Sequence, residues 1–133
     1  MSAPILPVDF DRDTGEFFRA AREDRLIYRA CNSCGCGMSI PAQFCGRCGS
    51  RDTSWREASG TGTLFTWTSV VHAVHPGYPA PYTIVIVALD EAPEVRFVGA
   101  LPGVPQLTAG QPMQVEWNEI SKSRGLPQWR PSA

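Results

Sequence analysis

The sequence predicts a mainly β protein with an N-terminal helix, a small metal-binding ribbon and a closed barrel of four or five short strands. Three observations carry this prediction. Two Cys-x-x-Cys-Gly units, at Cys31–Gly35 and Cys45–Gly49, stand ten residues apart. Twelve prolines and twelve glycines among 133 residues favour short elements and many turns. The chain after residue 57 is rich in Thr, Val, Phe and Trp, which strands prefer.

Residues 1–25 are expected to form an arm and then a helix. Two prolines oppose regular structure in Met1–Asp13, so this segment is predicted as the arm. Asp13 or Thr14 can cap a helix that ends near Asp24. Three arginines follow one another at spacing three, and they form either a phosphate or acidic-partner site or a solvated helix face. They are Arg19, Arg22 and Arg25.

Residues 26–56 are expected to form the ribbon, in which an extended Leu26–Ala30 leads to the first cysteine. Two residues between thiols allow both sulfurs to reach one ion at about 2.3 Å. The glycine after each pair permits the positive φ of a tight turn. Four thiolates close a tetrahedral zinc site and leave no position for water, which predicts one structural zinc ion. The predicted ligands are Cys31, Cys34, Cys45 and Cys48.

Cys36 is the fifth cysteine and has no partner in this pattern. It is an alternative to Cys34 in a Cys-x4-Cys knuckle, which the symmetry of the two pairs disfavours. Cysteines at this spacing, without a secretion signal, fit metal-bound thiolates in a reducing cytoplasm better than disulfides. No apolar stretch is long enough to span a bilayer, so we expect a cytoplasmic protein without a membrane partner.

Residues 57–133 are expected to form the barrel, whose closure removes exposed sheet edges. The loop His75–Pro81 separates the first two strands because it holds three prolines and a glycine. Tyr82–Leu89 is almost continuously apolar, which predicts a strand buried on both faces. The other strand candidates are Thr63–Val74, Glu94–Leu101, Met113–Ile120 and a short one within Leu126–Ala133.

Aromatic and imidazole side chains of the barrel are its candidate binding residues. Trp67, Tyr78 and Tyr82 either line a ligand groove or belong to the core; Tyr78 is expected to be exposed in its loop. His72 and His75 stand three apart, so in a strand they would point to opposite faces. A loop-lining or solvated role is therefore favoured over a metal pair. Neither has a nucleophile or an oriented acid nearby in sequence, which disfavours a catalytic dyad.

The charge distribution disfavours a nucleic-acid partner. The formal net charge of the chain is −1. Between residues 57 and 121 the sequence holds six acidic residues and one basic residue, Arg96, which gives this segment a charge of −5. Such a surface would repel a phosphate backbone.

Several segments in a fixed order carry a resemblance to a known family. They are Phe17–Phe18, Cys31–Gly35, Pro41, Cys45–Ser50, Trp55, Gly60–Thr63, Pro81–Tyr82 and Val87–Glu91. In this order they resemble the DUF35 family over about residues 14–131. The resemblance implies a rubredoxin-like zinc ribbon joined to a five-stranded OB-fold, with the four paired cysteines as the zinc ligands.

The resemblance also implies a role. DUF35 proteins are non-catalytic accessory subunits of thiolase-like enzymes, namely thiolases, acyltransferases and steroid side-chain aldolases, and some work with MaoC-like hydratases. The OB-fold assists the binding or transfer of acyl-CoA, and the loop His72–Tyr82 is expected near the partner's CoA entrance. Two rival functions stay open, a nucleic-acid-binding ribbon and barrel, and a stand-alone hydrolase that uses His72 or His75.

Overall fold

The computed structural model describes residues 9–121 and 124–132, so most of the predicted N-terminal arm lies outside the described residues. One short helix and two antiparallel sheets make up the fold, which confirms the mainly β prediction. The elements are α1 (Gly15–Ala21), β1 (Ile27–Cys31), β2 (Gly37–Met38), β3 (Thr53–Glu57), β4 (Thr61–Val70), β5 (Tyr82–Leu89), β6 (Arg96–Pro102), β7 (Pro112–Ser121) and β8 (Arg124–Pro131).

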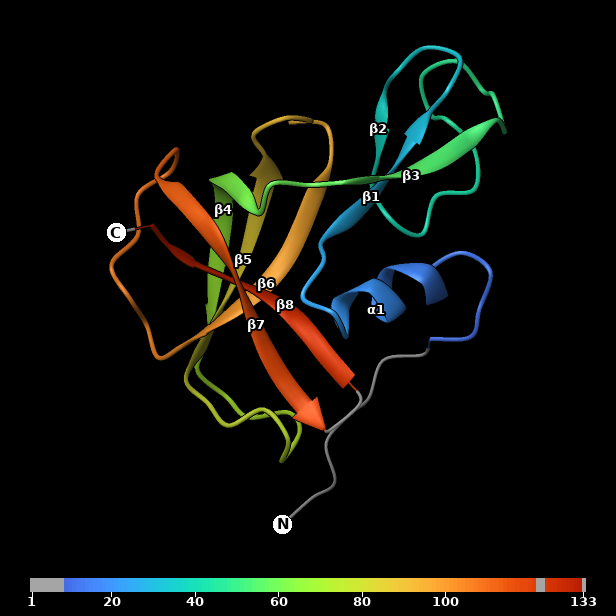
Figure 1. The fold of residues 1–133 in the computed structure, drawn as a ribbon. Coiled ribbons are helices and arrows are strands. Elements are labelled where there is room, and N and C mark those ends of the chain that lie inside the picture. Colours follow the sequence, from blue (N-terminus) through green and yellow to red (C-terminus); the bar gives the residue numbers. More distant parts are fainter. Residues whose placement is uncertain (1–8, 122–123, 133) are drawn as a thin grey trace.

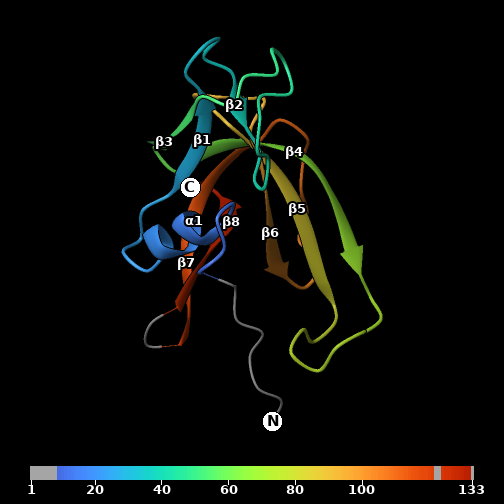
Figure 2. The ribbon, with the colours of Figure 1, turned by 90° about the vertical axis from the view of Figure 1, so that its right-hand side faces the viewer.

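The two sheets lie one above the other (Figure 1). The small sheet has the strand order β2-β1-β3 and carries the cysteine loops. The larger sheet has the order β6-β5-β4-β7-β8 and curls into a barrel. The loop that joins β4 to β5 lies at the end of the barrel opposite the small sheet, and Figure 2 shows the same separation after a quarter turn. No helix within the described residues is long and apolar enough to cross a bilayer.

The helix begins where the sequence predicts and ends earlier. Thr14 is the N-cap residue, but its hydroxyl donates to the carboxylate of Asp11 (2.7 Å) instead of capping the helix. The backbone N–H of Thr14 donates to the same carboxylate at 2.8 Å. The helix ends at Ala21 and not near Asp24, because Asp24 has a φ of 56° and turns the chain toward β1.

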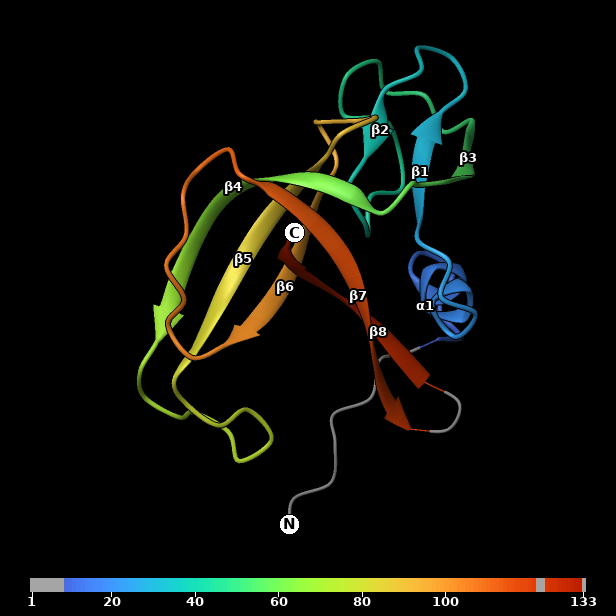
Figure 3. The ribbon, with the colours of Figure 1, turned by 60° about the vertical axis from the view of Figure 1, so that its left-hand side comes forward.

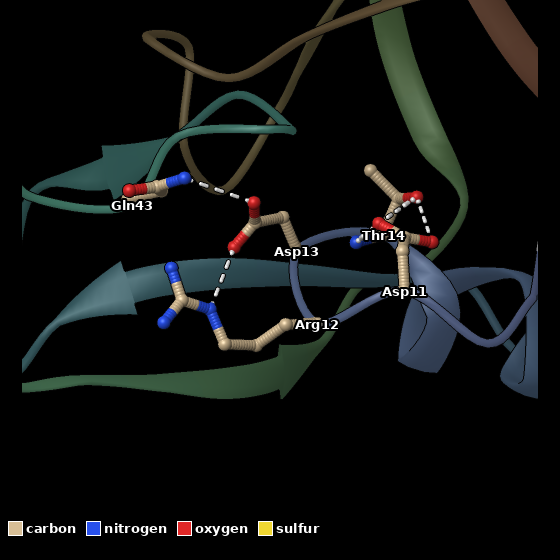
Figure 4. A network of polar contacts seen from close by, with 5 residues as sticks. All are labelled: Asp11, Arg12, Asp13, Thr14 and Gln43. Atoms are coloured by element: carbon tan, nitrogen blue, oxygen red, sulfur yellow. Dashed lines mark hydrogen bonds and ion pairs between the residues drawn. The ribbon is translucent and has the colours of Figure 1, made fainter.

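The segment before the helix is joined to the ribbon by side-chain contacts (Figure 4). The amide nitrogen of Gln43, in the loop after β2, donates to the carboxylate of Asp13 at 3.0 Å. Arg12 donates to the other oxygen of that carboxylate at 3.4 Å. The bond between Gln43 and Asp13 therefore connects the residues before α1 to the loop that leads to Cys45.

Two predictions about the β4–β5 hairpin need correction. β4 ends at Val70 and not at Val74, because Val70 pairs with Tyr82, the first residue of β5. Residues 71–81 form the loop that the prolines predicted. The bounds of β5 agree with the prediction, but its burial alternates, so only the face that bears Thr83 and Val85 is fully buried. The prediction of a strand buried on both faces is wrong.

The larger of two apolar clusters among the described residues connects the helix, the first strand of the ribbon and the barrel, and the smaller one holds Cys31, Met38 and Cys45 at the cysteine loops. The ring of Phe17 stacks on Phe97 at 5.6 Å between centroids, and Phe97 stacks on Trp129 at 6.2 Å. The first residues of β1 are buried in the same cluster. The core residues are Phe17, Ala20, Leu26, Ile27, Tyr28, Ala30, Leu64, Val85, Val87, Leu89, Ala92, Val95, Phe97, Met113 and Trp129.

The barrel closes where β6 meets β8, the two end strands of the sheet. The backbone N–H of Ala100 donates to the side-chain oxygen of Gln128 at 2.6 Å. A Cβ on Gly99 would lie 3.0 Å from the backbone nitrogen of Trp129, so a larger residue would require the two strands to move apart by a few tenths of an ångström. The described strands at this seam are therefore joined by a side chain and by close packing.

A buried hydroxyl at the loop end of the β4–β5 hairpin gives the first testable prediction. Thr83 is fully buried; its hydroxyl donates to the carbonyl of Gly103 at 2.8 Å and lies 2.9 Å from the Ser69 hydroxyl. Thr83→Val keeps the shape but removes the donor to the half-buried Gly103 carbonyl, while the exposed Ser69 hydroxyl can turn to water; we expect the free energy of unfolding to fall by about 1–2 kcal/mol. Urea unfolding measures the change. Thr68→Val, at an exposed position of β4, is the control, and equal effects of the two variants would contradict the prediction.

Candidate metal centre and hairpin surface

The two cysteine knuckles have the same backbone geometry. The N–H of Gly35 donates to the carbonyl of Cys31 at 2.9 Å, and the N–H of Gly49 donates to the carbonyl of Cys45 at 2.8 Å. Gly35 and Gly49 have φ values of 80° and 78°. Both knuckles therefore contain the positive-φ turn that the glycines predicted, and both present their sulfurs to the same point between them.

The four paired sulfurs form one group. All four lie within 4.8 Å of one another. Across the knuckles, the sulfurs of Cys31 and Cys48 are 3.5 Å apart, and those of Cys34 and Cys45 are 3.6 Å apart. A tetrahedral ion with metal–sulfur bonds of about 2.3 Å separates its ligands by about 3.8 Å. The donor set and its spacing therefore fit a tetrahedral metal site.

Backbone amides favour the thiolate form of the two buried sulfurs. The N–H of Cys34 points at the sulfur of Cys31 (3.5 Å), and this contact lowers the pKa of Cys31 to about 6. The N–H groups of Cys48 and Arg47 likewise lower the pKa of Cys45. Amide donors to a sulfur stabilise its negative charge, and the thiolate is the form that binds metal.

Cys36 lies outside the group of four. Its sulfur is 3.4 Å from the carbonyl oxygen of Gly37 and 3.9 Å from the carboxylate of Glu94. Burial, and then the charge of Glu94, raise the pKa of this thiol, so it stays protonated. The structure therefore groups Cys34, rather than Cys36, with the other three cysteines.

The three arginines at spacing three, Arg19, Arg22 and Arg25, all have partners within the chain. Arg19 donates to the backbone carbonyl of Asp9 at 2.6 Å, and Arg22 forms an ion pair with the Asp9 carboxylate. Arg25 donates to Glu57 at 2.7 Å. Arg19 and Arg22 share Asp9 as a partner, and Arg19 and Arg25 line one hollow that also holds carboxylates. This arrangement favours an ion-paired helix face over a phosphate site.

Only some of the aromatic candidates come together. Tyr78 and Tyr82 lie 6.2 Å apart, between ring centroids, beside an uncharged hollow of about 250 Å³. Trp67 lies outside this hollow on β4. The residues that line it are Gly77, Tyr78, Pro79, Tyr82, Ala100, Leu101, Pro102, Asn118 and Gln128. Sequence reasoning missed Asn118 and Gln128, because the fold brings them to the hairpin from β7 and β8 and no local pattern marks them.

The two histidines lie in the hairpin loop and not in a strand. His75 accepts a hydrogen bond from the N–H of Gly77 at Nδ1 (2.9 Å), and its ring lies 6.2 Å from that of Tyr78. His72 is exposed. The loop-lining and solvated placements are those that the sequence favoured.

Comparison with known proteins identifies the family. The family model of the C-terminal OB-fold domain of ChsH2 matches residues 55–118. A solved chain of the Ltp2–ChsH2(DUF35) aldolase superposes with a TM-score of 0.80 and 31% identity, over 94% of this chain and 98% of that one. The chain belongs to the DUF35 family. A DUF35 protein of unknown function from Sulfolobus solfataricus shares the fold, with a TM-score of 0.64, 14% identity and coverage of 93% and 89%.

A longer relative is also similar to this DUF35 chain. The probable enoyl-CoA hydratase alpha subunit of Thermomonospora curvata is 32% identical over 124 residues. The alignment covers 92% of this chain but only 38% of the relative's length. The resemblance to DUF35 and the predicted succession of ribbon and OB-like strands are therefore confirmed. The domain boundaries at residues 25/26 and 56/57 stay predictions.

Proposed function

We propose that this DUF35 protein is a non-catalytic accessory subunit that docks on a thiolase-like enzyme and assists the binding or transfer of acyl-CoA. The observation that carries the proposal is the 31% identity, over almost the whole of both chains, to the DUF35 chain of an aldolase that also contains Ltp2. The similarity to a hydratase alpha subunit named for enoyl-CoA supports CoA esters as the ligand class and a MaoC-like hydratase as a further partner.

The cysteine group is proposed to hold one structural zinc ion through Cys31, Cys34, Cys45 and Cys48. Four sulfur ligands fill a tetrahedral site, so the ion fixes the two knuckles and leaves no position for substrate. Thiolates that bind a metal, rather than form disulfides, suit a reducing cytoplasm, which is the proposed location.

The hairpin end of the barrel is the proposed contact with the ligand. The hollow beside Tyr78 and Tyr82 has no charged lining residue, so it suits the acyl or pantetheine part of the ligand better than its phosphates. The loop His72–Tyr82 would then lie at the partner's CoA entrance. The Nδ1 of His75 accepts a hydrogen bond from the N–H of Gly77, so no acid orients the imidazole at that nitrogen. Within the described residues, no observation supports the rival hydrolase function or the rival nucleic-acid-binding function.

Co-purification tests the proposal. We expect the tagged full-length chain, expressed in its native cell, to recover a thiolase-family subunit in a fixed ratio, identified by mass spectrometry. We also expect acyl-CoA to raise the melting temperature of that complex, because a ligand that binds only the folded state stabilises it. A free monomer without such a partner, with a melting temperature that CoA esters leave unchanged, would refute the accessory role.

A further inference from the structure

Among the described residues, the second half of β4 has no backbone hydrogen-bond partner on one side. β4 pairs with β5 over almost its whole length but with β7 only at Thr61–Thr63. The linker between β6 and β7 bonds to β4 at Leu64, through Gly110 and Gln111, and at no later residue. Figure 3 shows β4 and β7 diverging from the point where they pair. Within the described residues, the second edge of Phe65–Val70 therefore lacks backbone partners.

The register identifies which backbone groups face this free edge. The backbone N–H of Asp90 donates to the carbonyl of Thr61 in β4, whereas the N–H of Leu89 donates to the carbonyl of Val95 on the β6 side. Backbone groups alternate in direction along a strand, so the even-numbered residues of β5 direct theirs toward β4. Thr66, Thr68 and Val70 pair with such residues. The intervening residues, Trp67 and Ser69, therefore direct their N–H and C=O groups away from β5, toward the free edge.

The free edge carries neither the charges nor the prolines that protect many exposed strands, and a β-bulge between Leu64 and Thr66 marks where it begins. Residues 58–89 contain no Asp, Glu, Lys or Arg, and β4 contains no proline. The ring of Phe65 is 50% exposed and Trp67 is 37% exposed. The Arg96 guanidinium lies 3.8 Å from the centroid of the Phe65 ring, at the border of this surface. An uncharged edge with exposed aromatic side chains favours pairing with another strand.

We propose that an extended, uncharged segment of the thiolase-like partner adds to the sheet as a strand beside Phe65–Val70. This inference rests on the proposed function and deepens it by naming the surface and the kind of segment that binds there. A second copy of the chain is the less suitable occupant. A dimer held only by this edge would contribute about six residues from each copy, far fewer than the roughly 20–30 residues a side of a stable interface. In a complex with the thiolase-like partner, the added strand would be one part of a larger contact.

A proline substitution tests the proposal at one hydrogen bond. Ser69→Pro removes an N–H that faces the free edge and leaves the pairing of β4 with β5 intact. Ser69→Ala is the matched control, because it also loses the hydroxyl that contacts Thr83 but keeps the N–H. With the co-purified thiolase-family subunit as the probe, we expect Ser69→Pro to weaken binding at least tenfold and Ser69→Ala by less than twofold. Equal affinities would overturn the proposal while leaving the accessory role intact.

Hydrogen exchange on the wild-type complex gives a second measurement that needs no variant. The amides of Trp67 and Ser69 are expected to exchange at least tenfold more slowly in the complex than in the free chain, because each gains an acceptor. Unchanged exchange at these two amides would overturn the proposal even if Ser69→Pro failed to fold. Sedimentation that shows the isolated chain as a dimer, lost in Ser69→Pro and kept in Ser69→Ala, would also overturn it, since a second copy would then occupy the edge.

Discussion

Replacing Cys31 by serine is expected to remove the metal ion and unfold the ribbon. Its sulfur is fully buried between the knuckles, 3.5 Å from that of Cys48. A structural zinc site supplies on the order of 10 kcal/mol, which a three-stranded sheet of this size cannot replace by packing. We expect the metal content to fall from one zinc per chain to nearly none. Elemental analysis and hydrogen exchange across residues 27–57 measure the two effects.

Cys36→Ser is the matched control for this prediction. It makes the same chemical change at a cysteine five residues away that contacts Gly37 and Glu94 instead of the other sulfurs. We expect this variant to keep its zinc and its melting temperature within a few degrees. If Cys36→Ser lost the metal as Cys31→Ser does, the ligand set would have to include Cys36. Separately, a folded wild-type protein that contained iron or no metal would exclude the closed zinc site.

Gly62→Ala is expected to destabilise the barrel by about 3 kcal/mol. A Cβ at this position would overlap the side chain of Val87 and lie 2.7 Å from the carbonyl oxygen of Ala88. The carbonyl belongs to the neighbouring strand and cannot move without breaking the pairing of β4 with β5, and overpacking of this kind costs roughly 1–3 kcal/mol or more. The melting temperature should fall by about 10 °C.

Gly46→Ala is the control for this substitution. A Cβ there meets no atom within 4 Å. The same added methyl group should therefore change the melting temperature by no more than about 2 °C, as for most surface substitutions. A similar loss in both variants would mean that the close approach of β4 and β5 does not limit the barrel's stability.

The parts of the fold that the sequence predicts well depend on local patterns. The two knuckles follow from the spacing of cysteines and glycines within five residues. The loop between β4 and β5 follows from its prolines, and the bounds of β5 follow from an apolar run. The alternating burial of β5 could not be predicted, because an apolar run does not tell whether a second layer covers the outer face.

The parts that the sequence does not predict depend on residues far apart in the chain. The partner of Arg25 is Glu57, 32 residues away, so the charge pattern of the helix could not decide between a phosphate site and an ion-paired face. The hollow at the hairpin takes Gln128 from the last strand. The end of β4 is set by the first residue of β5 and not by β4's own composition.

The continuous core has a consequence for how the protein responds to its surroundings. Ile27 and Tyr28 of the ribbon are buried in the same cluster as Val85 and Val87 of the barrel. Stability added by the proposed zinc ion would therefore be shared with strands that hold no ligand. In the saturating range, each tenfold rise in free zinc adds about 1.4 kcal/mol to a fold that binds one ion. The folded fraction of the barrel, including the free edge of β4 at Phe65–Val70, should then follow the zinc supply of the cell.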